Sequence, residues 1–209
     1  ISLVIVEDTM FDEAVQKAID AGIPVITTNV DDSEGAAGNA RLAFVGQDLY
    51  QAGYELAKEL SKQFPEGDTH VLLGLSAPGQ NWAELRIGGV RQFMEEYKDA
   101  NPNKKVTWDT IDSGLDTSVT GQRICAYVQG HPETNAYFDA GFWGSGAGEC
   151  LRDLGLKPGD LLMAMFDLVD ITMDEMDKGY VNLTIDQQPY LQGYLPILQM
   201  YLMKEFGLS

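Results

Sequence analysis

Short apolar runs alternate with amphipathic stretches along the whole chain, and this alternation restricts its fold more than any other feature. The runs have the length and the apolar or β-branched content of strands that are covered on both faces. We expect strands at Leu3–Val6, Pro24–Thr28, Leu42–Val45, His70–Leu75, Lys105–Asp109, Ala136–Ala140, Leu161–Phe166 and Val181–Ile185.

The stretches between these runs place apolar residues at intervals of three to four, as amphipathic helices do. We expect helices at Phe11–Ala21, Tyr50–Gln63, Ala83–Lys98, Thr117–Val128, Gly146–Asp153, Ile171–Lys178 and Tyr190–Glu205. Gly22, Pro65 and Pro102 follow the first three helices, where helices commonly stop. The repeated strand and helix order predicts an α/β fold around mainly parallel sheets.

The charge of the chain excludes several kinds of partner. Lys plus Arg number 14 against 32 Asp plus Glu, which gives a formal net charge of −18. Such a surface repels phosphate backbones and anionic lipid headgroups, so we expect no nucleic-acid binding. No apolar run approaches the ~18 residues that a membrane-spanning helix needs.

Two features of the sequence resemble metal or redox sites, but the spacing of their residues does not match such sites. Cys125 and Cys150 form no CxxC pair; they permit one disulfide, but we favour two small, unpaired, buried helix residues. The acidic segment 31–35 lacks a bidentate Glu at the distance a calcium loop requires, so we expect a solvated loop. The sequence therefore predicts no metal site.

Enzymatic motifs are also absent. The two histidines are His70, which opens a strand, and His131, which precedes Pro132 in a turn, and neither is placed like the base of a catalytic triad. The chain has no P-loop, no GxSxG and no GxGxxG after its first strand. We expect neither catalysis nor a cofactor.

Four segments carry a resemblance to a known family. They read AVQKAIDAGIPVITTN from Ala14, FVGQDLYQAGYELAKEL from Phe44, GVRQFMEEY from Gly89 and LTIDQQPYLQGYLPI from Leu183. In order and spacing they resemble the ribose-binding-like branch of the type I periplasmic solute-binding proteins, which serve sugar ABC importers.

The resemblance implies two doubly wound, Rossmann-like lobes with a ligand in the cleft between them. It assigns residues 1–46 and 188–209 to a first lobe and 47–187 to a second. On this mapping the first lobe is incomplete, since two βα units before residue 1 and the final crossing strand are missing. The resemblance also implies export to the periplasm, although no signal peptide opens the sequence.

Three polar residues fall where the resemblance puts ligand contacts. Asn29 ends the second strand, Arg86 lies early in the third helix, and Asp167 follows Phe166 at the end of a strand. Amides, carboxylates and the guanidinium fork suit the adjacent hydroxyls of a polyol. The structural alternatives are a turn-forming Asn, a solvated ion-pair partner and a helix N-cap, respectively.

Gln187, Trp82 and Trp143 complete the candidate set. Gln187 lies at the returning crossover between lobes, where its alternative is a role in the hinge alone. Trp82 lies in a Gly/Pro loop, and Trp143 follows a strand in Gly141-Phe142-Trp143-Gly144, where the family commonly has Asn-Asp. An indole ring stacks on the apolar face of a sugar as readily as it fills a core.

These residues predict the substrate-binding component of an ABC importer, which binds a sugar or sugar-like polyol and docks on a membrane permease. The alternative is the ligand-sensing core of a LacI-type transcriptional repressor, which shares the fold. The strong negative charge weakens that alternative, since such a core works beside DNA.

Overall fold

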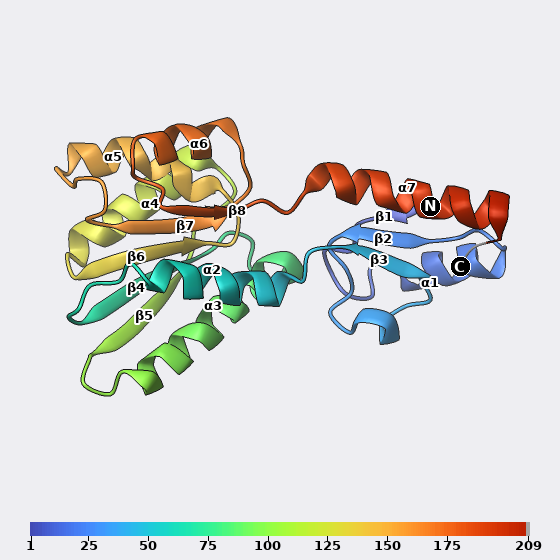
Figure 1. The fold of residues 1–209 in the computed structure, drawn as a ribbon, viewed down its shortest axis with the longest axis horizontal. Coiled ribbons are helices and arrows are strands. Elements are labelled where there is room, and N and C mark those ends of the chain that lie inside the picture. Colours follow the sequence, from blue (N-terminus) through green and yellow to red (C-terminus); the bar gives the residue numbers. More distant parts are fainter. Residues whose placement is uncertain (208–209) are drawn as a thin grey trace. The chain divides into compact units, whose positions relative to one another are not determined.

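The computed structural model describes residues 1–207, which divide into two compact units (Figure 1). The first unit holds Ile1–Asp48, Gly79–Trp82 and the chain from Gln187 onward; the second holds Leu49–Pro78 and Ala83–Asp186. The short segment Gly79–Trp82 joins the first unit because Asn81 donates its backbone N–H to Val6 (3.0 Å) and its amide to Asp8 (2.6 Å).

The first unit is a three-stranded parallel sheet in the order β1-β2-β3. Its elements are β1 (Ser2–Leu3), α1 (Asp12–Asp20), β2 (Ile26–Asn29), β3 (Ala43–Gly46) and α7 (Pro189–Phe206). Helix α7 packs along β2 and β3. The first strand is shorter than expected because β1 is an edge strand with one partner, although Ile5 still donates to the Val30 carbonyl (3.0 Å).

The second unit is a five-stranded parallel sheet in the order β5-β4-β6-β7-β8. Its strands are β4 (Thr69–Leu75), β5 (Val106–Asp112), β6 (Thr134–Asp139), β7 (Leu162–Phe166) and β8 (Leu183–Ile185). Its helices are α2 (Leu49–Ser61), α3 (Asn81–Ala100), α4 (Thr117–Gly130), α5 (Gly148–Asp153) and α6 (Asp170–Asp177). Figure 1 shows α2 and α3 on one face of this sheet and α4, α5 and α6 on the other.

Both faces of the second sheet are buried, as the continuous apolar runs predict. Leu72, Tyr137 and Met165 pack into a core with residues of α4 and α5. The next residue along each strand points to the opposite face, and Leu73, Phe138 and Phe166 are fully buried there. The predicted elements and the α/β class are confirmed. Among residues 1–207 no helix is both long and apolar enough to cross a membrane.

Two expectations are wrong. Cys125 and Cys150 form a disulfide between α4 and α5, whose close packing brings the two Cα atoms to 6.3 Å, within the usual range for a bridge. The acidic loop is not simply solvated. Asp31 forms an ion pair with Arg41, and buried Asp32 accepts the backbone N–H of Glu34 (2.8 Å). The disulfide depends on the packing of two helices, whereas these two contacts of the acidic loop each join residues no more than ten apart in the sequence.

Candidate functional site

The strand order of the second unit marks one edge of its sheet as the candidate ligand site. Strand β4 is flanked by its successor β5 on one side and by β6 on the other. Parallel sheets of this order bind ligands at the carboxyl ends of the strands, beside the point where the order reverses. In this unit the point lies at the ends of β4 and β6, at Leu75 and Asp139.

Arg86 reaches this edge from the second turn of α3. Its side chain is buried, with 4% of the residue exposed, so the solvated ion-pair alternative is wrong. Nη1 donates to the Ala140 carbonyl just after β6 (2.9 Å), and the guanidinium carbon lies 3.9 Å from the centroid of the Phe166 ring. Burial lowers the pKa of Arg86 to about 10, against the opposing attraction of Asp167 and Asp139, so the group stays charged at neutral pH.

Two glycines fix the backbone that carries Arg86. A Cβ at Gly53 in α2 would collide with the carbonyl oxygen of Arg86, and a Cβ at Gly89 in α3 would collide with the carbonyl oxygen of Tyr50. Both positions therefore need glycine for α2 and α3 to approach so closely. This contact holds the Arg86 backbone in one place before any ligand binds.

Asp167 continues the chain directly after Phe166, at the carboxyl end of β7. Its φ of +72° is left-handed, a conformation that costs a non-glycine residue about 1–2 kcal/mol. The backbone holds it there, since its N–H donates to Ile185 (2.9 Å) and its carbonyl accepts from the Thr184 hydroxyl (2.9 Å). The N-cap of α6 is Val169, without a side-chain capping bond, so the alternative role of Asp167 as an N-cap is wrong.

Asp139, at the end of β6, organises the turn that carries Trp143, and the sequence reasoning missed it. Its fully buried carboxylate accepts hydrogen bonds from Ser76 (2.6 Å), the Tyr137 hydroxyl (3.0 Å) and the backbone N–H groups of Gly141 (2.9 Å) and Gly144 (2.6 Å). Burial raises the pKa of Asp139, although all four hydrogen bonds favour its charged form. A carboxylate directly after the run Ala136-Tyr137-Phe138, at the end of a strand, is the signal that could have revealed it.

The half-buried ring of Trp143 folds back over this turn. It stacks on Phe142 with ring centroids 4.7 Å apart, and a Cβ at Gly141 would collide with the indole. Trp143 therefore stands at the carboxyl edge of the sheet, after β6, while Arg86 and Asp167 stand beside β6 and β7 of the same unit. These three candidates belong to one edge of the same sheet.

Asn29 and Gln187 meet in the first unit. The Asn29 amide donates to the side-chain oxygens of Gln187 (3.0 Å) and Gln192 (2.9 Å), and the Gln192 amide donates to the Gln187 carbonyl (2.6 Å). The backbone of Asn29 is in the left-handed region, with a φ of +66°, which is what the alternative role as a turn-forming residue predicts. This network anchors the start of α7 to the end of β2; ligand binding by the two side chains stays a prediction.

Trp82 also belongs to the first unit. Its indole N–H donates to the side-chain oxygen of Gln80 (2.6 Å), and the residue is half-buried. Trp82 is the second residue of α3, so the expected loop position is wrong; its contact with a ligand remains a prediction.

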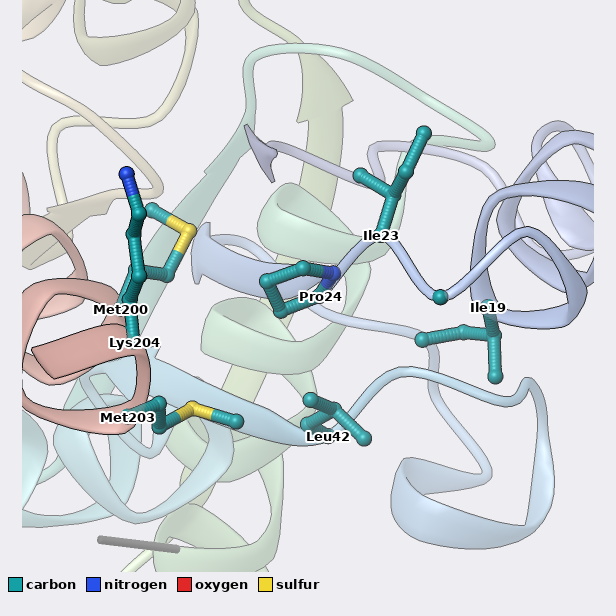
Figure 2. A pocket seen from close by; sticks show the side chains of 8 residues that line it. Ile19, Ile23, Pro24, Leu42, Met200, Met203 and Lys204 are labelled. Carbon is teal, nitrogen blue, oxygen red and sulfur yellow. The ribbon is translucent and has the colours of Figure 1, made fainter. Parts of the chain in front are cut away.

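A groove of about 610 Å³ in the first unit has the wrong chemistry for a polyol (Figure 2). It lies before the amino ends of β2 and β3, beside Pro24 and Leu42, and the side chains of Met200 and Met203 from α7 close it. Lys204 is the one charged residue in its lining. Hydroxyl recognition needs several converging polar groups, so we place no sugar site there.

The polar edge of the second unit can do what this groove cannot. A charged guanidinium held against an aromatic face donates several hydrogen bonds in a fixed fork, and a nearby carboxylate accepts them from hydroxyls. Arg86 and Asp167 supply these two functions, and Trp143 supplies a flat apolar surface at the same edge. An arrangement of this kind is chemically suited to a polar ring, and ligand binding by these three residues stays a prediction.

Comparison with known proteins finds two curated relatives of the chain. The chain is 32% identical to the xylose/arabinose-binding protein XylF of Sulfolobus acidocaldarius, over 97% of this chain and 51% of that protein. It is 26% identical to the fructose import binding protein FruE of Bifidobacterium longum, over 88% of this chain and 55% of that protein. The chain spans about half the length of these curated relatives.

A solved structure and a family profile extend the comparison. An ABC sugar transporter (periplasmic sugar binding protein) from Legionella pneumophila superposes with a TM-score of 0.84 at 27% identity, covering 99% of this chain and 74% of that one. The profile described as "Periplasmic binding protein domain" matches residues 1–207. The chain belongs to this family of periplasmic binding proteins.

Proposed function

We propose that the protein is the substrate-binding component of an ABC importer and that it binds a sugar or sugar-like polyol through Arg86, Asp167 and Trp143. The observation that carries the proposal is the buried, charged Arg86, fixed by Phe166 and Ala140 beside the strained Asp167. Strain in a non-glycine residue at a strand end is typical of a functional position.

The wider proposal covers the lobes and the remaining candidates. The proposed lobes, residues 1–46 with 188–209 and residues 47–187, follow the two units except at residues 47–48, 79–82 and 187. Asn29, Gln187 and Trp82 are proposed as further ligand contacts. The relatives named for xylose, arabinose and fructose support a monosaccharide as ligand. A permease is the partner that this function requires.

The proposed function also includes export from the cytoplasm and binding of the ligand without catalysis. The disulfide between Cys125 and Cys150 supports an exported protein, because such bonds persist in oxidising compartments. It also disfavours the core of a cytoplasmic repressor, as does the net charge of −18. The protein binds its ligand without chemical change, in keeping with relatives that are solute-binding proteins.

A ligand panel tests the proposal. The protein in its full encoded length is screened by thermal shift with xylose, arabinose, ribose, fructose, glucose and inositol, and glycerol serves as an unspecific control. A ligand at 100 times its Kd stabilises the folded protein by about 2.7 kcal/mol, so at least one sugar should raise Tm clearly. Equal Tm values across the panel would contradict the proposal.

A further inference from the structure

A second cluster of functional side chains lies at the opposite edge of the five-stranded sheet. His70 is the second residue of β4, His131 caps the carboxyl end of α4, and Glu133 immediately precedes β6. All strands of this sheet are parallel, so these positions share its amino edge, whereas Arg86 and Asp167 lie at the carboxyl edge. The cluster plays no part in the proposed sugar site.

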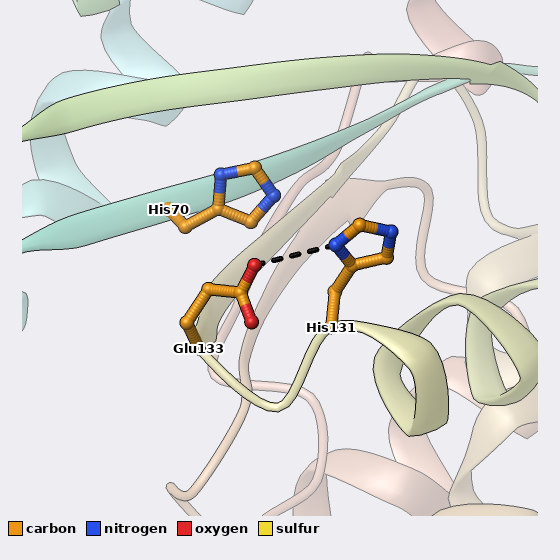
Figure 3. A group of neighbouring side chains, drawn as sticks. All are labelled: His70, His131 and Glu133. Atoms are coloured by element: carbon orange, nitrogen blue, oxygen red, sulfur yellow. Dashed lines mark hydrogen bonds and ion pairs between the residues drawn. The ribbon is translucent and has the colours of Figure 1, made fainter.

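The three side chains converge (Figure 3). One ligand atom from each of His70, His131 and Glu133 lies within 4.8 Å of the other two, and His131 Nδ1 is 3.3 Å from Glu133 Oε1. Ligands at about 2.0–2.2 Å from a tetrahedral ion stand about 3.3–3.6 Å apart, so the cluster has to contract by as much as about 1.5 Å. The side chains of His131 and Glu133 are 45% and 60% exposed, which leaves both room to move toward His70.

Surrounding groups orient His70. Its side chain is 12% exposed, with Nδ1 2.8 Å from the Thr107 hydroxyl and Nε2 2.8 Å from the Tyr127 hydroxyl, so an ion bound at either nitrogen replaces one of these hydrogen bonds and the other orients the ring. The Tyr127 ring stacks on His131 with centroids 4.3 Å apart, and its hydroxyl donates to Asp109 (2.5 Å). Metal-binding histidines are oriented by such outer partners, which set the ring angle and the tautomer.

The donor set selects the kind of ion. Two imidazole nitrogens and one carboxylate suit zinc and its neighbours among the transition metals, whereas calcium and magnesium require oxygen ligands. The carboxylate of Asp109, 3.9 Å from His70 Nε2, adds negative charge beside the cluster. Lys105 lines the adjacent pocket of about 240 Å³, but its residue is exposed and its ammonium can extend into solvent.

We propose that His70, His131 and Glu133 bind one transition-metal dication of the zinc class, with water completing the coordination shell. The ion ties β4 to the turn between α4 and β6 and stabilises the second unit, since metal binding to the folded state adds to folding free energy. This site is separate from the sugar site and stands whether or not the protein binds sugar.

Calorimetric titration with Zn²⁺ tests the proposal on tag-free protein, because a polyhistidine tag would bind zinc itself. The double variant His131→Ala/Glu133→Gln changes two exposed side chains and should keep the fold. We expect one Zn²⁺ per wild-type chain and a loss of affinity of about tenfold or more in the variant. Glu66→Gln, an exposed acid elsewhere in the second unit, serves as the matched control and should leave binding unchanged.

Two further measurements distinguish a specific metal site from unspecific binding of cations to the acidic surface. Co²⁺ bound by nitrogen ligands should give visible absorption in the wild type that the double variant lacks, and Zn²⁺ should raise Tm only where the site is intact. Ca²⁺ in excess should not compete. Absence of one-to-one Zn²⁺ binding, unchanged affinity in the double variant, or displacement by Ca²⁺ would each overturn the proposal.

Discussion

The guanidinium of Arg86 lies 3.9 Å over the centroid of the Phe166 ring, and the residue that follows this ring is Asp167. One strand end thus supplies both the surface that orients the arginine and the carboxylate that attracts it. Cation–π stacking and the hydrogen bond to Ala140 restrict the guanidinium before a ligand arrives. Such preorganisation lowers the entropic cost of binding.

The strained backbone of Asp167 predicts a conflict between stability and binding. Glycine accepts a φ of +72° without strain, but the change also removes the carboxylate that attracts the buried Arg86, so Asp167→Gly should alter the free energy of unfolding by less than about 1 kcal/mol. The same change removes the carboxylate, and sugar affinity should fall by about tenfold or more. Urea unfolding and calorimetry measure the two effects; a destabilised variant that still binds would refute this account of Asp167.

The disulfide between α4 and α5 should contribute strongly to stability. It joins residues 25 apart, and a loop of that length corresponds to about 3.5 kcal/mol in the chain-entropy treatment. Urea unfolding with and without a reducing agent measures the contribution. The double variant Cys125→Ala/Cys150→Ala is the control: it should be less stable than the oxidised wild type and insensitive to the reductant.

Glu175 should make stability sensitive to acid. Although burial raises its pKa, hydrogen bonds from Arg152 (2.8 Å) and Lys178 (2.7 Å) bring that pKa below the usual 4.5. The folded state therefore favours the carboxylate. The contribution is present above pH 4.5 and is lost as the pH falls through the lower, folded pKa.

Glu175→Gln isolates this contribution. Because both partners are partly exposed, the variant should lose about 1 kcal/mol at neutral pH and should show a smaller decline between pH 5 and about pH 3. Glu66→Gln, an exposed acid elsewhere in the second unit, is the control. Parallel stability curves for wild type and Glu175→Gln across this pH range would show that the ion pair contributes nothing.

The apolar surface of α7 should drive self-association of the 209-residue chain. Ile197 and Tyr201 are 59% and 55% exposed, and β1 leaves one edge of its sheet without a strand partner. Exposed apolar patches and sheet edges both promote association. In sedimentation experiments Ile197→Glu should reduce the associated fraction, whereas Val119→Glu, at a comparably exposed position in α4, should not. A wild-type chain that stays monomeric at high concentration contradicts the prediction.

The order of strands and helices could be predicted from the sequence because each element has a local cause. Strand β7 is a continuous apolar run, and α2 repeats its apolar residues at helical spacing. Strand β5 was predicted to end at Asp109 but continues to Asp112, since β4 supplies it with a ladder partner throughout. Pairing of this kind is decided by a neighbour and is invisible in a local pattern.

The site was predicted only in part, for a similar reason. Arg86 and Asp167 were identified through the resemblance of their segments to a family. The buried acceptor role of Asp139, the pairing of Cys125 with Cys150, and the approach of His131 to His70 each join residues from separate elements. Spacing along the chain carries no signal for contacts that only the packed sheet creates.

Calorimetric titration of sugars into the protein in its full encoded length tests the central claim most directly. Arg86→Met keeps the apolar stem but removes the guanidinium, and Arg91→Met makes the same change elsewhere on α3, at an arginine whose partner is Thr110. We predict that one monosaccharide binds the wild type and Arg91→Met alike, while Arg86→Met loses about ten- to a hundredfold in affinity. Equal affinities of a folded Arg86→Met variant and the wild type would contradict the account.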